Sequence, residues 1–97
     1  MFVVAMSLDF LLGDVASLKQ KRSVVRPLVA ELARRYTVSV AEVGHQDLYR
    51  RAEIGVALAT ADSGHGQSVL DEVERWCAAR PEVELLAARR WLRSDDD

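Results

Sequence analysis

"TVSVAEVGHQDLYRRAEIGVALAT", residues 37–60, contains two extended segments joined by a short polar connection. Residues 37–43 and 51–60 alternate between larger and smaller or polar side chains, and many of them are β-branched, which is typical of strands. Gly44 and Asp47 in the connection are residue types that favour turns. This stretch therefore predicts two consecutive antiparallel strands in the middle of the chain.

An amphipathic helix is expected before this pair of strands. Apolar residues recur there at helical spacing, at Val25, Leu28, Val29, Leu32, Ala33 and Tyr36. Ser17 and Gln20 have the spacing of a capping box. Pro27 lacks a backbone donor and crowds the preceding turn, so we expect a short turn over residues 17–22 and the main helix over residues 23–36.

A second helix is expected after the strands. Its apolar stripe consists of Val69, Leu70, Val73, Trp76 and Cys77. Gly64 and Gly66 predict a loop ahead of this helix, Ser68 with Asp71 supplies a cap, and Pro81 ends it. Cys77 belongs to the stripe, so we expect it in the core and not among metal ligands.

The ends of the chain supply two outer strands, over residues 2–12 and 82–92, each with alternating character. The resulting order βαββαβ predicts an α+β, ferredoxin-like fold. Its four-stranded antiparallel sheet has the order 4-1-3-2, with both helices on one face. We expect a single domain over residues 1–92 and an acidic, disordered tail over residues 93–97.

Two motifs connect the chain to a known family. "SLKQKRSVV" (17–25) and "VSVAEVGHQDLYRRAEIGVA" (38–57) resemble the YlxP-like family of small bacterial proteins, grouped under a domain of unknown function. The similarity runs from residue 2 to about residue 92. It implies a ferredoxin-like fold and a cytoplasmic bacterial protein. Genes of this family often lie among those for translation initiation and ribosome maturation, which implies a connection with RNA or the ribosome. The family supplies no catalytic residues.

Composition narrows the function classes. The formal net charge of the 97-residue chain is −2, which argues against a strongly electrostatic, sequence-blind nucleic-acid binder, and no DNA partner is expected. The only cysteine, Cys77, has no partner for an intrachain disulfide. The apolar opening, residues 1–12, contains Asp9 and is shorter than a membrane span, so we expect no membrane contact and a cytoplasmic location.

Cations gather at one end of the predicted fold. In a βαββαβ sheet, the connection from the first strand to the first helix lies beside the connection between the second and third strands. That placement brings together Lys19, Lys21, Arg22, Arg50 and Arg51. Basic side chains at a helix N-terminus oppose the helix dipole, which suggests a purpose such as contact with RNA phosphates. The plain alternative is that three of them are the solvated start of a helix. The contact interpretation predicts a non-enzymatic accessory factor of translation or ribosome assembly.

A polar cluster lies in the same region, at Glu42, His45, Gln46 and Asp47. We interpret it first as a structural corner, in which Asp47 and Gln46 bind backbone groups and a carboxylate pairs with Arg50 or Arg51. The alternative is a metal-dependent or acid–base enzyme that uses Glu42, His45 and Asp47. Since these side chains alternate in direction along a strand, we assign no catalytic residue, no metal and no cofactor.

The sheet face without helices is expected to be flat and mildly apolar, with the candidate interface residues Ala5, Ala41, Val43, Ala57 and Ala59. Such patches often mark interfaces, so a homo-oligomer, most simply a two-fold dimer, is a further hypothesis for this face. It carries with it an alternative function, a homo-oligomeric module for a small ligand or another protein. An exposed antiparallel sheet also tolerates small residues without any partner. The central positions of this face, among them Ser7, Asp9 and Gly55, offer no aromatic platform for stacking RNA bases.

Overall fold

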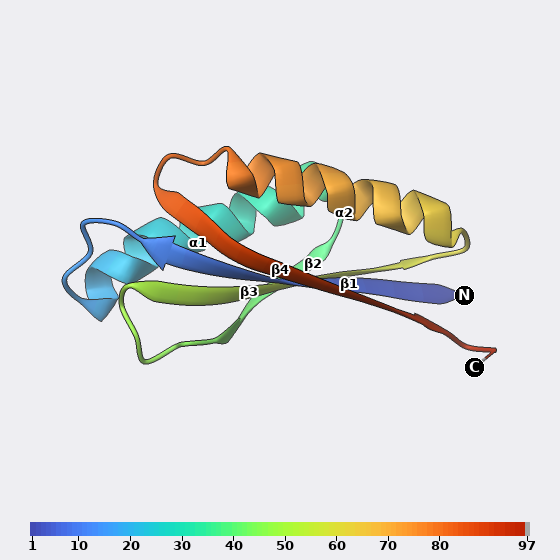
Figure 1. The fold of residues 1–97 in the computed structure, drawn as a ribbon, viewed down its shortest axis with the longest axis horizontal. Helices are drawn as coiled ribbons and strands as arrows, with labels where there is room; N and C mark the ends of the chain where they lie inside the picture. The colour runs from blue at the N-terminus through green and yellow to red at the C-terminus, as the bar shows by residue number, and fades with distance from the viewer. Residues whose placement is uncertain (97) are drawn as a thin grey trace.

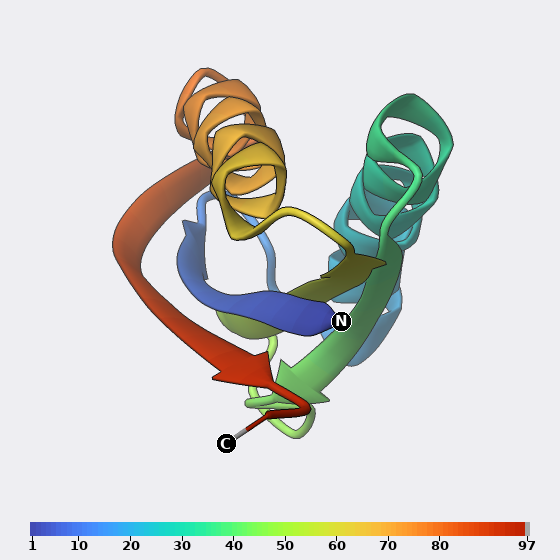
Figure 2. The same ribbon diagram turned by 90° about the vertical axis from the view of Figure 1, so that its right-hand side faces the viewer.

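The computed structural model describes residues 1–96. Its elements are β1 (Phe2–Leu12), α1 (Leu18–Tyr36), β2 (Ser39–Gly44), β3 (Arg51–Thr60), α2 (Ser63–Ala78) and β4 (Val83–Ser94). The strands form one antiparallel sheet in the order β2-β3-β1-β4, and both helices cover the same face of it (Figures 1 and 2). The predicted ferredoxin-like fold is confirmed, because this order is 4-1-3-2 counted from the other edge.

The core lies between the helices and one face of the sheet. Alternate residues of β1, from Val4 to Leu12, are buried against α1 and α2. Ile54 and Val56 of β3 join them, together with Leu32 of α1. Period-two alternation in the central strands therefore separates a helix-covered face from an open face. Within the described residues, neither helix is long and apolar enough to cross a membrane.

The predicted break in the first helix was wrong. α1 is continuous from Leu18, because Ser17 caps it: the Ser17 hydroxyl accepts from the Gln20 amide at 3.1 Å, and the Gln20 side chain accepts from the Ala16 amide at 2.6 Å. Pro27 lies on the exposed side of the helix. The carbonyl that loses its helical donor there, that of Ser23, is on the same solvated side, so water can satisfy it.

The predicted loop before the second helix was also wrong. Asp62 caps α2 by accepting from the Gly64 amide at 2.8 Å, so the helix begins at Ser63. Gly66 is buried where the first turn crosses the sheet, and a Cβ there would lie 2.7 Å from Val4 Cγ2. The glycine therefore permits close packing of helix on sheet and is not a loop residue.

Gly66→Ala is expected to lower the free energy of unfolding by about 1 kcal/mol. Overpacking a tight contact costs about 1–3 kcal/mol, against a gain of about 1 kcal/mol from the higher helix propensity of alanine. Urea unfolding followed by circular dichroism measures the difference. Gly13→Ala is the matched control, since a Cβ at Gly13 meets nothing within 4 Å. A Gly66→Ala protein as stable as this control would contradict the packing role.

The end of the chain differs in detail from the expectation. β4 continues to Ser94, two residues beyond the predicted strand, and the Met1 amino group donates to the Asp95 carboxylate at 2.9 Å. The boundary of the acidic tail stays a prediction, and its last residue, Asp97, lies outside the described residues.

Candidate functional site

The connection between β1 and α1 lies beside the connection between β2 and β3, as the topology predicts. The Leu12 amide donates to the Arg50 carbonyl at 2.9 Å, and the Arg50 Nε donates to the Leu12 carbonyl at 3.2 Å. The first turn of α2, which contains His65, lies at the opposite end of the molecule (Figure 1). The structure therefore brings most of the sequence-predicted polar and basic residues to one end.

Lys21 does not face solvent. Only 3% of it is exposed, and its ammonium group donates to the carbonyls of His45 and Leu48, each at 2.7 Å. The same nitrogen lies 2.7 Å from the carboxylate of Glu42. Lys21 thus attaches α1 to the β2–β3 connection and is not available to bind phosphate. The burial of Lys21 could have been predicted from its spacing. Lys21 precedes Val25 by four residues, so both lie on the buried stripe of α1.

Three other cations of α1 do face solvent. Lys19, Arg22 and Arg26 follow one another at intervals of three and four residues, on the exposed side of the helix. None of them forms an ion pair or a side-chain hydrogen bond with any residue of the described part of the chain. The sequence contains no acidic residue between Asp14 and Glu31. Arg26, which the sequence-based set omitted, completes this row.

Arg50 and Arg51, which follow the polar cluster, lie in different environments. Arg50 is exposed and uses only its Nε on the Leu12 carbonyl. Arg51 is directed onto the open face of the sheet, where its Nη2 donates to the Asp9 carboxylate at 2.5 Å. We call the exposed set of Lys19, Arg22, Arg26 and Arg50 the basic patch. Arg51 is paired with Asp9 and is not a member of this patch.

The polar cluster of residues 42–47 does not converge on one point. Glu42 points toward the helices and pairs with Lys21, whereas the His45 imidazole lies on the open side, with its Nε2 3.7 Å from Asp9 Oδ1. The Gln46 side chain donates to the Glu42 carbonyl at 3.1 Å, and Asp47 is exposed. Over residues 1–96, no group of three or more His, Cys, Asp or Glu residues is placed to hold a metal ion. This geometry supports the structural-corner interpretation, although its carboxylate pairs with a lysine and not with Arg50 or Arg51.

His45 has a backbone φ of 57°, in the left-handed region that non-glycine residues seldom adopt. The β2–β3 pairing also shifts register between Glu42 and Gly44, a bulge at the end of β2. The three hydrogen-bonding and ionic contacts of Lys21 hold this corner. Backbone strain of this kind persists only where surrounding contacts fix it.

The open face of the sheet is arranged in rows that the strand register defines. One row runs Ser39, Ala57, Ala5, Trp91 from β2 to β4, and the next runs Ala41, Gly55, Ser7, Arg89. The short side chains of β1, β2 and β3 on this face, such as Ala5, Ala41 and Ala57, form the floor of a depression of about 340 Å³. Trp91, 56% exposed, and Val43, 55% exposed, stand at its two sides. The face is therefore stepped and not flat as predicted.

A polar depression of about 290 Å³ adjoins this floor. The Ser7 hydroxyl donates to the Glu53 carboxylate at 2.5 Å, and Arg89 lies 3.7 Å from the same carboxylate. Asp9 pairs with Arg51 at the far side. These pairs could not be predicted from the sequence, because they join residues more than 30 positions apart.

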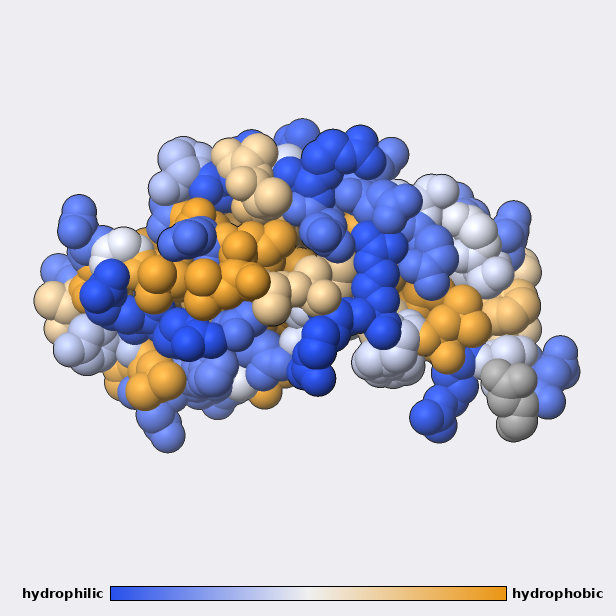
Figure 3. All heavy atoms as spheres, in the orientation of Figure 1, coloured by the Kyte–Doolittle hydropathy of each residue, from blue (hydrophilic) through white to orange (hydrophobic). Residues whose placement is uncertain are grey.

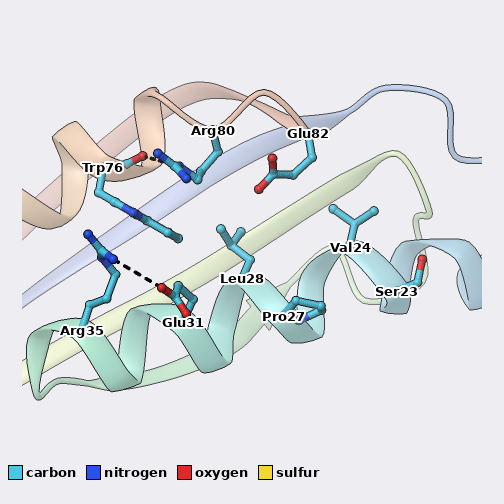
Figure 4. A pocket seen from close by; sticks show the side chains of 9 residues that line it. All are labelled: Ser23, Val24, Pro27, Leu28, Glu31, Arg35, Trp76, Arg80 and Glu82. Carbon is cyan, nitrogen blue, oxygen red and sulfur yellow. Dashed lines mark hydrogen bonds and ion pairs between the residues drawn. The ribbon is translucent and has the colours of Figure 1, made fainter.

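A groove of about 560 Å³ lies between α1 and α2 (Figure 4). Trp76 projects into it, with the guanidinium of Arg80 4.5 Å and that of Arg35 5.7 Å from its ring centre. Glu31 pairs with Arg34 and Arg35, and the hydrogen bond from Arg34 lowers the pKa of Glu31. The cations of this groove are thus engaged within the chain, and its charges indicate no ligand.

Comparison with known proteins shows which sequences this chain resembles. A family model described as "Protein of unknown function (DUF503)" matches residues 3–90. The chain is 28% identical over 81 residues to the uncharacterized protein YlxP of Bacillus subtilis (strain 168), covering 84% of this chain and 88% of that protein. The resemblance inferred from the two motifs is thereby confirmed.

Solved structures share the fold at low sequence identity. The de novo designed protein LFR1 1, which has a ferredoxin fold, aligns with a TM-score of 0.54 and 11% identity over 98% of this chain and 88% of its own. A mutant of SnoaB, a cofactor-independent oxygenase from Streptomyces nogalater, aligns with a TM-score of 0.52 and 13% identity over 98% of this chain and 94% of its own. At such identities, the likeness speaks to the fold alone.

Proposed function

Because the chain belongs to the DUF503 family of proteins of unknown function, we propose its function from its own surface. The protein is a non-enzymatic, cytoplasmic accessory factor of translation or ribosome assembly that contacts RNA through the basic patch. The proposal rests on the row of Lys19, Arg22 and Arg26 along the first half of α1, which form no ion pair within residues 1–96 and have no acidic residue between them. Arg50 extends the row from the neighbouring connection.

The position of this row favours phosphate as its ligand. The N-terminal end of a helix carries partial positive charge, and the first turn of α1 contains no acidic side chain to offset it. Lys19, in this first turn, is repelled by the helix dipole, and a phosphate group would relieve that repulsion. Contacts of this kind position RNA without reading its bases. They also agree with the open face, where the central strands β1 and β3 present no aromatic residue for stacking.

A salt series on RNA binding tests the proposal. We expect the purified protein to bind ribosomal RNA with a logarithmic affinity that falls linearly as the logarithm of salt concentration rises. The variant with alanine at Lys19, Arg22 and Arg26 should lose about 2 from the magnitude of this slope, since each phosphate contact on single-stranded RNA contributes about 0.7. Fluorescence anisotropy with labelled ribosomal RNA fragments measures both.

A matched control removes the same charge elsewhere. Arg34, Arg35 and Arg75 lie outside the basic patch, so their replacement by alanine changes the net charge equally. We expect this control to keep the wild-type slope. Equal losses in both variants would reduce the effect to net charge, and absence of wild-type binding at low salt would exclude the RNA contact.

A further inference from the structure

We propose that the open face of the sheet binds a second copy of this chain in a two-fold symmetric dimer. In this arrangement Trp91 of each copy occupies the depression on the other copy, and Arg89 of each lies beside Glu53 of the other. The inference is independent of the RNA contact, because Lys19, Arg22 and Arg26 of the basic patch lie on α1, and the open face lies on the side of the sheet away from the helices (Figure 2).

The open face has larger side chains along β4 than along the other strands. Along β4 the open-face positions are Ala87, Arg89, Trp91 and Arg93, whereas the same rows on β1, β2 and β3 are mostly alanine, glycine or serine. Arg89, Trp91 and Arg93 are therefore longer than the side chains beside them on β1 and β3, and Val43 stands at the β2 side of the depression. A two-fold axis parallel to the strands places the β4 edge of each copy over the β2 edge of the other. Because this axis keeps each row opposite itself, Trp91 of one copy lies over the row of Ser39, Ala57 and Ala5 of the other.

The depression fits the side chain that would enter it. Its floor is Ala5, Gly55 and Ala57, and its volume of about 340 Å³ exceeds the roughly 150 Å³ cavity that already accepts a benzene ring. Val43 leans over Gly55, where an added Cβ would lie 2.9 Å from Val43 Cγ1. Trp91 is the exposed aromatic of the same face, and a buried tryptophan is a common anchor of interfaces.

Charge complementarity supports the same partner. The β4 edge carries Arg89 and Arg93, and the adjoining polar depression carries the carboxylates of Glu53 and Asp9, of which Asp9 is already paired with Arg51. Since the axis keeps each row opposite itself, Arg89 of one copy lies over the row of Gly55, next to the row of Glu53. Within one chain the Arg89 side chain is still 80% exposed, and its 3.7 Å approach to Glu53 leaves it free to bridge.

Pairing through the edge of β4 is the competing dimer. Figure 3 shows hydrophobic surface gathered over β4 on that side of the molecule. The edge is interrupted, however, because the pairing of β1 with β4 shifts register between Asp9 and Phe10, and a bulge of this kind discourages a further strand. Edge pairing would also leave Trp91 and the depression uncovered.

Substitution of the anchor is the first test. We expect the wild-type protein to sediment as a dimer at high micromolar concentration and Trp91→Ala to sediment as a monomer, with an unchanged circular dichroism spectrum. Tyr49→Ala is the control, because Tyr49 is an exposed aromatic outside the open face. A wild-type monomer, or a Trp91→Ala protein as dimeric as the control, would overturn the proposal.

Charge reversal separates contacts between copies from contacts within one. Arg89→Glu and Glu53→Arg should each dissociate the homodimer, because each places like charges across the interface. An equimolar mixture of the two variants should form a heterodimer, since one copy then presents only acidic and the other only basic side chains at these positions. Two monomeric variants that stay monomeric on mixing would contradict the assigned register, and variants that stay dimeric alone would point to the β4 edge.

Discussion

Lys21→Met is expected to lower the free energy of unfolding by about 3 kcal/mol. Methionine keeps the length of the lysine stem but removes the ammonium group. The carbonyls of His45 and Leu48 and the carboxylate of Glu42 then lose the donor that they share. Breaking a buried ion pair on one side costs about 3–5 kcal/mol, and the partial exposure of Glu42 places the expectation at the lower end.

Urea unfolding followed by circular dichroism measures this loss. Lys19→Met is the matched control, because Lys19 is exposed on the same turn and forms no ion pair within residues 1–96. Its stability should stay within about 0.5 kcal/mol of the wild type. A double variant, Lys21→Met with Glu42→Leu, should recover part of the loss, since it leaves no unpaired carboxylate. Equal stability of Lys21→Met and Lys19→Met would contradict the anchoring role.

The same residue shows what the sequence predicts and what it does not. The order of elements follows from local periodicity, because alternation in residues 37–60 and helical spacing from Val25 to Tyr36 are properties of neighbouring residues. The continuity of α1 depends instead on which side of the helix Pro27 faces. Because of Pro27, the main helix was expected to begin only at residue 23, after a short turn over residues 17–22. Lys21 fell in that turn, so it was assigned to the surface and not to the buried stripe of α1.

Which residues are exposed on the candidate surfaces depends more on tertiary contacts than the order of the elements does. The exposed row at Lys19 and Arg22 could be predicted, because an uninterrupted basic segment needs no knowledge of the fold. The pairing of Arg51 with Asp9 and of Ser7 with Glu53 depends on the register between β1 and β3, which sequence alone leaves open. The raised edge at Trp91 likewise follows only from the alignment of β4 with β1.

Cys77 is expected to react with a thiol-alkylating reagent at pH 8 at least about 1,000-fold more slowly in the folded protein than in the unfolded chain. The Cys77 side chain has no exposed surface, because it lies on the buried side of α2, in the core between the helices and the sheet, as the apolar stripe predicts. Burial raises the pKa of the Cys77 thiol from 9.0 to about 12, which lowers the thiolate population in the folded state. The thiolate is the reacting species, so this change accounts for about 10³ in rate before any steric protection.

The direction of the pKa change also sets a pH dependence. A thiol whose pKa is raised by folding contributes stability that is fully present below pH 9.0 and is lost as the pH rises toward 12, because the unfolded chain releases the proton first. Labelling in urea at the same pH supplies the unfolded rate, and Cys77→Ala, which should not label at all, supplies the background. Native labelling as fast as in urea would mean that α2 opens readily. Slow labelling means that the reagent reaches Cys77 only when the packing of α2 on the sheet is lost.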